Sequence, residues 1–203
     1  MPIVLKEKVG QQVSAGTHIA VCNRIALIGT QPDSGYGERE KLIIFWEIPA
    51  ETIEYDGKTM PMAISKIYSL GTSGGMNKKS SLRQDLAAWR GRDFTKEELE
   101  GFELKAILGK GCQVTVEHNE EGRAKVSRVV GLPKGMASPS TATTLVEYSI
   151  EEGKNEIYKA LPEWVRKMCD ACLEWNPEKR QSMPTEEANH GFPPPDVDDS
   201  SPF

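Results

Sequence analysis

Residues 41–48 read KLIIFWEI, a short and nearly continuous run of apolar and aromatic side chains. A run of this length predicts a β-strand that other parts of the chain cover on both faces. Phe45 and Trp46 are neighbours in the run, so they point to opposite faces of the strand. At most one of these two rings is therefore available to a ligand. Pro49 ends the predicted strand.

Four further segments have the pattern of β-strands. Residues 17–28 alternate, with Ile19, Val21, Ile25 and Leu27 on one face, and the two unlike faces are typical of the bent first strand of a small barrel. The dipeptide Asp56-Gly57 is a hairpin signal. The other predicted strands span residues 62–70, 112–117 and 124–130, and the last two are joined by a turn at 119–122.

The region between the third and fourth predicted strands holds two predicted helices. Ser80 or Ser81 caps the first helix, and Gly91 stops it. Thr95, with Glu98 three residues later, forms the capping box of the second helix. The predicted helices span residues 79–90 and 95–109.

The remaining chain divides by composition. Residues 1–132 form the predicted core domain, and residues 133–150 are rich in Pro, Ser, Thr and Gly, which predicts a connecting linker. Residues 151–175 have the apolar spacing of one amphipathic helix, and because Pro162 lies inside the pattern, a helix that starts at Pro162 is the alternative. Residues 176–203 are polar, Pro-rich and acidic, which predicts a disordered tail.

The order strand, strand, strand, helices, strand, strand is that of the OB-fold. This fold is a five-stranded Greek-key barrel that binds oligonucleotides across its second and third strands. The predicted class is therefore mainly β with added helices (α+β). We expect a five-stranded OB-fold barrel with a helical insertion between strands 3 and 4, a C-terminal helix and a disordered acidic tail.

Charge is distributed unevenly along the chain. The net charge is −5, but residues 176–203 alone contribute −4. Residues 58–92 carry seven basic side chains against the single acid Asp85, a local charge of +6. Local asymmetry of this kind is what nucleic-acid binding requires, whatever the total charge.

Composition narrows the location and the chemistry. No apolar run approaches the ~18 residues of a membrane span, and the first residues lack the apolar segment of a signal peptide. Cys169 and Cys172 form a CxxC pair, but no second pair follows, and His118 and His190 lie at no ligand spacing. We expect buried thiols, no metal, no cofactor, and a cytoplasmic protein of the bacterial host cell that associates with the nucleoid.

The end of the sequence is a short acidic run followed by Pro-Phe. Carboxylates beside one apolar anchor and a terminal charge make a segment that partner proteins can capture. The tip residues are Asp196, Asp198, Asp199, Pro202 and Phe203. They resemble the acidic C-terminal tip of bacterial and phage single-stranded DNA-binding proteins, and the long helical insertion is more similar to divergent phage members. The resemblance implies a protein that binds and protects single-stranded DNA in replication or recombination, and recruits partner proteins through the tip.

Single-strand binders need cations along the DNA backbone and aromatic faces for the bases. The candidates for phosphate contact are Arg24, Lys41, Lys66, Lys78, Lys79, Arg83, Arg90 and Arg92. The candidates for base stacking are Trp46 and Tyr68, with Tyr36 and Tyr55 as further aromatic residues. Lys66 and Tyr68 share one face of a predicted strand, and this makes them the leading pair.

Other functions remain open on the sequence alone. An OB-fold adaptor would bind protein through the same aromatic face without nucleic acid. An enzyme is not expected, because no Ser/His/Asp or Cys/His set is visible and the glycine-rich residues 71–75 lack the P-loop pattern. We expect no membrane partner. The sequence leaves the oligomeric state undecided, with a homodimer as one option.

Overall fold

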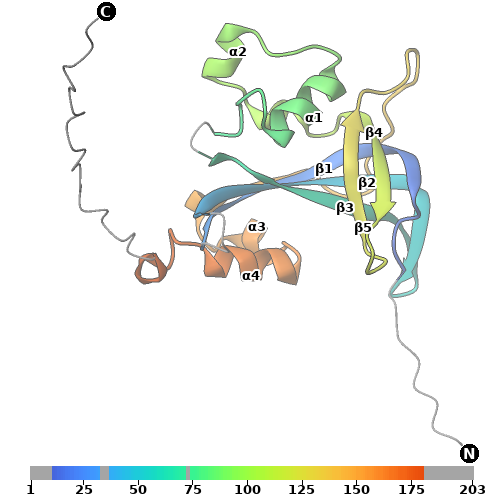
Figure 1. Cartoon of the computed structure of the whole chain (residues 1–203). Coiled ribbons are helices and arrows are strands. Elements are labelled where there is room, and N and C mark those ends of the chain that lie inside the picture. The colour runs from blue at the N-terminus through green and yellow to red at the C-terminus, as the bar shows by residue number, and fades with distance from the viewer. Residues whose placement is uncertain (1–10, 33–36, 72–73, 181–203) are drawn as a thin grey trace, which may run out of the picture.

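The structure is a computed structural model that describes residues 11–32, 37–71 and 74–180. Tyr36 and the tip residues lie outside the described residues. The elements follow in the order β1 (Gly16–Gln31), β2 (Arg39–Tyr55), β3 (Lys58–Ser69), α1 (Ser81–Arg90), α2 (Lys96–Glu100), η2 (Leu104–Ile107), β4 (Gly111–His118), β5 (Ala124–Val130), β6 (Val146–Ser149), η3 (Ile150–Glu152), α3 (Glu156–Lys159), α4 (Glu163–Ala171) and η4 (Pro177–Lys179). The predicted order of strands and helices is thus confirmed through β5 (Figure 1).

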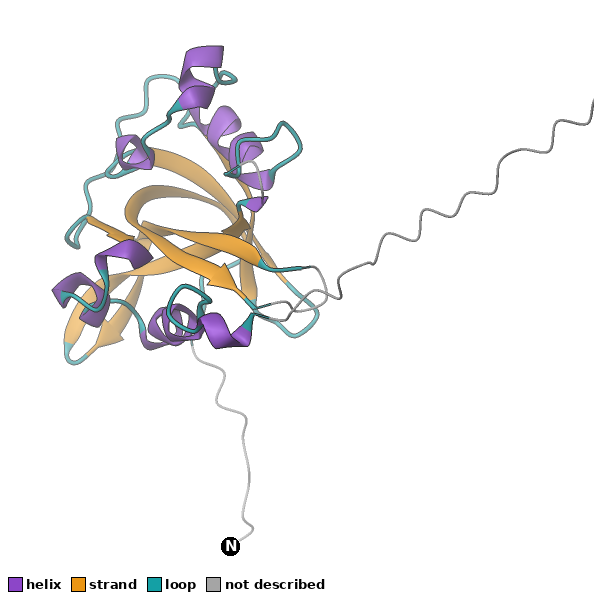
Figure 2. Ribbon diagram, turned by 90° about the vertical axis from the view of Figure 1, so that its left-hand side faces the viewer, coloured by secondary structure: helices purple, strands orange, loops and turns teal. Residues whose placement is uncertain are grey.

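The strands form one mainly antiparallel sheet in the order β3-β2-β1-β4-β5, and β6 pairs with β1 in parallel. β1 changes partner along its length: Gly16 to Val21 pair with β4, and Arg24 to Leu27 pair with β6. The sheet curls strongly (Figure 2). It is not closed into a barrel, because no backbone pairing joins its end strands β3 and β5 within the described residues.

Apolar side chains pack on both faces of the sheet. The inner cluster lies within the curl and under α1, and the outer cluster lies under β6, α3 and α4. Figure 1 shows α1 and α2 above the sheet and α3 and α4 below it. β2 serves both clusters, because Trp46 belongs to the inner cluster while Ile43 and Phe45 belong to the outer one. The prediction of a strand covered on both faces is confirmed.

Local signals account for the ends of α1 and the start of α2. Ser80 is the N-cap of α1 and accepts a hydrogen bond from the Arg83 N–H, while Gly91 ends the helix at φ 71°, a left-handed conformation that suits glycine. Thr95 and Glu98 form the predicted capping box. α2 is shorter than predicted, since Gly101 leaves the helix with an extended backbone at φ −171°.

The C-terminal third differs from its prediction. Residues 133–150 are no plain linker, because β6 pairs with β1 and the backbone N–H groups of Ala142 and Thr143 donate to the buried Glu47. The single helix predicted over residues 151–175 is two short helices. Pro162 separates them, because proline lacks an N–H and disfavours helical backbone at the residue before it. No helix in the described ranges has both the length and the apolar character needed to cross a membrane.

Candidate nucleic-acid interface

Lys66 and Tyr68, the leading predicted pair, lie on the inner face of β3 and not on an open surface. Tyr68 is 1% exposed. Its hydroxyl donates to Asp85 Oδ2 at 2.9 Å, and Lys66 Nζ donates to the same oxygen at 2.7 Å. Burial, followed by the Asp85 charge, raises the pKa of Tyr68 above its ordinary value, so the phenol remains a donor. The pair therefore holds β3 to α1, and the Tyr68 ring, which was predicted to stack on a base, has no exposed face in this structure.

The same lysine also bridges the open side of the sheet. Lys66 Nζ donates to the Ser127 carbonyl of β5 at 3.4 Å. The contact lies between the two end strands, which share no backbone pairing. Lys66 thus links β3, α1 and β5, and this use competes with any contact to a phosphate.

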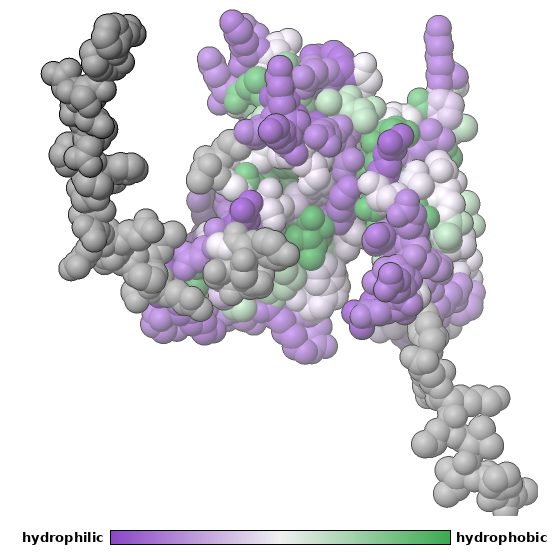
Figure 3. All heavy atoms as spheres, in the orientation of Figure 1, coloured by the Kyte–Doolittle hydropathy of each residue, from purple (hydrophilic) through white to green (hydrophobic). Residues whose placement is uncertain are grey.

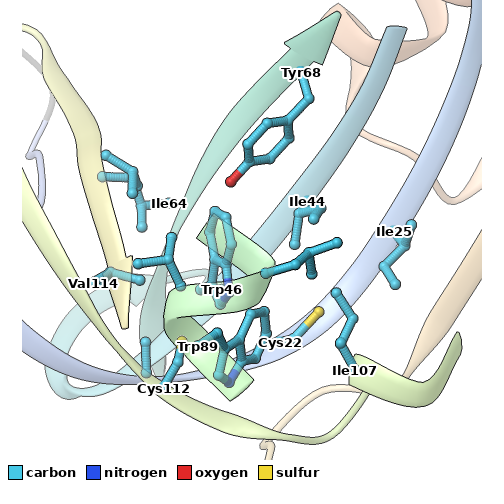
Figure 4. Packing of buried hydrophobic residues seen from close by; sticks show 14 of the residues in the cluster. Cys22, Ile25, Ile44, Trp46, Ile64, Tyr68, Trp89, Ile107, Cys112 and Val114 are labelled. Atoms are coloured by element: carbon cyan, nitrogen blue, oxygen red, sulfur yellow. The ribbon is translucent and has the colours of Figure 1, made fainter. Parts of the chain in front are cut away.

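Trp46 is part of the inner core. Its side chain is completely buried, and its ring centroid lies 6.3 Å from that of Trp89. Figure 4 shows both indoles among apolar side chains such as Ile44 and Val114. Trp46 was predicted to stack on a base, but in this structure both faces of its ring are covered. Trp89 donates from Nε1 to the Gly111 carbonyl at 2.8 Å and so ties α1 to β4.

Arg83 is buried on α1 and makes three hydrogen bonds. Its Nε and Nη2 donate to the two carboxylate oxygens of Asp93 at 2.9 Å each, and its Nη1 donates to the Met76 carbonyl at 3.0 Å. The two bonds to Asp93 form the bidentate arrangement that is typical of an arginine paired with a carboxylate. Arg83 therefore fixes the chain on either side of α1, and it is not the phosphate contact that the sequence predicted.

Arg90 and Arg92 share one carboxylate. Both donate to Glu98, and Arg92 does so through two bonds of 2.9 and 2.7 Å. The Arg90 guanidinium also lies over the rings of Phe94 and Phe102, at 4.4 and 5.1 Å from their centroids. Hydrogen bonds from Arg92 and from the Thr95 backbone, with a further contribution from Arg90, lower the pKa of Glu98 to about 2. Two more of the predicted DNA contacts are thus paired within the protein.

Lys78 and Lys79 differ from the other cations of this region. Both are exposed in the turn before α1, and neither forms an ion pair among the described residues. The charge of Lys78 contributes to the lowered pKa of Asp93. Tyr55, 71% exposed, lies directly opposite Lys58 at the end of the β2–β3 hairpin. These positions remain accessible, but the structure does not gather them into one surface.

The outer face of the sheet presents a different group of side chains. We define the outer-face patch as Arg24 of β1, Phe45 of β2, Ile67 of β3 and Trp164 of α4. The Arg24 guanidinium carbon lies 5.5 Å from the Phe45 ring centroid, and the Trp164 ring lies 5.8 Å from the same ring. Trp164 is 42% exposed and Ile67 is 43% exposed. Figure 3 shows apolar surface between the helices above the sheet and those below it.

Of the two other residues on this face, Lys41 was predicted as a DNA contact and Trp164 was not. Lys41 shares the outer side of β2 with Phe45, as the alternation of the strand dictates, and is half-buried. Trp164 was missed, because it was assigned to the apolar stripe of one long helix. Pro162 carried the signal that could have found it: a helix starting after Pro162 buries Val165 and Cys169, and leaves Trp164 beside that stripe.

Arg24 is, with Lys41, one of two predicted DNA contacts that are both half-buried and unpaired within the described residues. Within the described part of the chain, no hydrogen bond or ion pair satisfies its guanidinium, and its Nε is buried without a partner. Burial lowers the pKa of Arg24. Glu47, on the same face of β2, is already occupied: its carboxylate accepts from Asn23 Nδ2 at 3.2 Å and from the Ala142 N–H at 2.7 Å.

The cysteines and acids supply no other site in the described residues. Burial raises the pKa of Cys22 and of Cys169 to about 12, so both remain thiols at neutral pH. No group of three or more His, Cys, Asp or Glu side chains there is arranged to hold a metal ion. The outer-face patch is therefore the strongest candidate on the described surface.

A guanidinium that lacks a carboxylate, placed beside an exposed indole, can accept an anion and a flat ring together. Phosphate and a nucleobase have this chemistry, and so do a carboxylate and an aromatic side chain. The inner side of the sheet lacks this chemistry, because Lys66, Arg83 and Arg90 there are paired with carboxylates. Comparison with known proteins adds no relative: no family model matches the chain, and no curated protein matches it significantly.

Proposed function

We propose that this chain is an OB-fold protein that binds single-stranded DNA without catalysis, in phage DNA replication or recombination. The observation that carries the proposal is the strand order β3-β2-β1-β4-β5, with α1 between β3 and β4. A five-stranded sheet with this order and a helix at this point is consistent with the OB-fold, which is itself only partly closed. The missing backbone pairing between β3 and β5 is therefore compatible with the assignment.

The outer face is the side on which DNA would bind. OB-folds bind oligonucleotides across their second and third strands. On the inner side these strands are covered by α1 and by the Lys66–Asp85 pair. On the outer side β3 exposes Ile67, β2 carries the half-buried Lys41, and α4 adds the exposed Trp164 next to the buried Phe45. The outer face thus offers the exposed Trp164 indole, and Arg24 and Lys41 there have no ion pair within the described residues.

Recruitment of partners is the second half of the proposal. The tip residues Asp198, Asp199, Pro202 and Phe203 combine carboxylates with one aromatic anchor. We propose that a replication or recombination protein binds this tip. A pull-down with the full chain and with Phe203→Ala tests this, and equal capture by both proteins would contradict it.

A fluorescence titration with oligo(dT) tests DNA binding directly. We expect tryptophan quenching, with affinity that falls as salt rises because bound cations release counterions from the DNA. Duplex DNA at equal nucleotide concentration should compete poorly, because its bases are already stacked on each other. Equal competition by duplex DNA would contradict the proposal.

A protein-binding adaptor is the second candidate, and one observation favours it. Ile67 of β3 and Trp164 of α4 both expose apolar surface, whereas Lys66, Arg83 and Arg90 are already paired. Apolar protein interfaces depend weakly on salt. A tight partner whose binding is insensitive to salt, with no binding of oligo(dT), would therefore favour the adaptor.

A further inference from the structure

Arg24 lies where β1 exchanges β4 for β6 as its neighbour, next to a register shift between Cys22 and Arg24. Its cross-strand neighbours are apolar on both sides, Phe45 on β2 and Val146 on β6. A guanidinium carries five N–H donors and stays charged. Burying part of a guanidinium without a counter-charge is unfavourable unless an anion binds to its N–H groups.

Arg166 of α4 offers a comparison with Arg24. Its Nε is also buried without a partner. However, Arg166 lies close enough to Asp170 and Glu163 for its charge to help lower the pKa of both carboxyls. Among the described residues no carboxylate is paired with Arg24, and Glu47 is engaged by Asn23 and residues 142–143. An external anion is therefore expected at Arg24 and not at Arg166.

Trp164 provides a flat surface next to this cation. One side of the indole contacts Phe45 at a ring distance of 5.8 Å, and 42% of the residue remains exposed. Arg24 approaches the same Phe45 ring at 5.5 Å. The cation and the exposed indole therefore contact the same buried ring, one from β1 and the other from α4.

We propose that Arg24 and Trp164 form a one-nucleotide site for single-stranded DNA, in which Arg24 binds a backbone phosphate and the Trp164 indole stacks on an unpaired base. This inference rests on the proposed function and locates its principal contact. An exposed ring can stack only on a base whose face is free, so the site selects single strands. Phosphate suits Arg24 because its oxygens accept paired donors from a guanidinium.

The test uses the full chain and an oligo(dT) of about 16 nucleotides, the upper end of the span that one OB-fold covers. Trp164→Leu keeps apolar contact with Phe45 but removes the stacking face, and should weaken binding about 5- to 100-fold. Arg24→Met keeps the aliphatic stem and removes the charge. It should weaken binding and reduce the slope of log affinity against log salt by about 0.7.

Matched controls come from the same helical segment. Lys167→Met removes an exposed cation of α4 that is already paired with Glu163 at 2.7 Å, and should leave the salt slope unchanged. Trp164→Phe should abolish most of the quenching, whereas Trp175→Phe should retain it, because Trp175 contacts Tyr158 and not Phe45. Denaturant unfolding of each variant separates loss of binding from loss of fold. If Arg24→Met does not fold, Arg24→Lys replaces it, with weaker binding and an unchanged slope expected.

The outcomes separate this inference from the proposed function. Normal binding of oligo(dT) by folded Arg24→Met and Trp164→Leu overturns the one-nucleotide site and leaves DNA binding intact. Absence of oligo(dT) binding in the unmodified chain overturns both. A peptide that ends in DDSSPF offers the alternative chemistry, a carboxylate with an aromatic ring. If that peptide binds through Arg24 and Trp164 while oligo(dT) does not compete, the patch is a peptide site and the nucleotide assignment is wrong.

Discussion

The two faces of the sheet use their cations in opposite ways. On the inner side, Lys66, Arg83 and Arg90 each bind a carboxylate of the same chain. On the outer side, Arg24 lies over Phe45 and binds none within the described residues. In the richest basic segment, residues 58–92, Lys66, Arg83, Arg90 and Arg92 are thus paired within the chain. A count of charges along a sequence does not give the charge that is free to bind a ligand.

The cause lies in how α1 is attached. Its own Asp85 binds Lys66 of β3, and the carboxylates of Asp93 and Glu98 lie just beyond the basic segment that ends at residue 92. A window that stops at residue 92 therefore includes the cations and omits two of their partners. Packing a helix over a curled sheet half-buries these side chains, and half-buried charges are stable when paired.

The tryptophans of the two faces give the largest predicted difference. Trp46→Ala should lower the free energy of unfolding by about 3–5 kcal/mol, because a fully buried indole leaves a cavity. Trp164→Ala should cost about 1–2 kcal/mol, because much of its ring is exposed. Urea unfolding of both variants measures the difference. Equal costs would contradict the division into a structural inner face and a binding outer face.

Asp85 tests whether the inner cations serve the fold. Asp85→Ala should cost about 2 kcal/mol, because it removes the acceptor shared by Lys66 and Tyr68. Lys66→Met should cost less, since the Tyr68 hydroxyl keeps its partner. Neither change should alter the salt slope of oligo(dT) binding, in contrast to Arg24→Met. A smaller salt slope of oligo(dT) binding in folded Lys66→Met would indicate that Lys66 contacts DNA and that the inner side is the binding face.

Glu98 gives a pH test of the inner pairing. Its folded pKa, about 2, lies below the ordinary 4.5, so the carboxylate stabilises the fold above pH 4.5 and loses this contribution as pH falls toward 2. Arg92→Ala should raise the Glu98 pKa, because the Arg92 hydrogen bonds are the main cause of its depression. NMR titration of the Glu98 carboxyl measures both proteins. A midpoint near 4.5 in the unmodified chain would mean that the pairing does not persist in solution.

Removal of the acidic tail should give the smallest effect. Residues 176–203 carry −4 and can compete with DNA for free cations on the same chain. Truncation after Asn176 should tighten oligo(dT) binding at low salt and change little at high salt, because screening removes the competition. If the competition takes place at Arg24, the tightening should disappear in Arg24→Met. Equal affinities of the full and truncated chains at low salt would contradict a competing tail.

Several elements were predictable because their signals are local. The strand Ala124–Val130 has the predicted bounds, and Ser80, Gly91 and Thr95 delimit the helices as expected. β6 was not predictable from local pattern: it has four residues and pairs in parallel with a distant strand. β6 pairs with β1 only beyond the residues of β1 that pair with β4, on the far side of the register shift between Cys22 and Arg24.

The sequence by itself determined the order of the elements and the two-faced character of β2, since side-chain alternation, caps and turns act between near neighbours. Only the tertiary structure decided which candidates are accessible. Trp46 and Trp164 are both apolar in the sequence, yet one is enclosed by α1 and the other lies beside Phe45 at the surface. Lys66 and Arg24 are both basic, yet only Lys66 meets a carboxylate. Burial and ion pairing join residues that are far apart along the chain, and a local pattern does not contain that information.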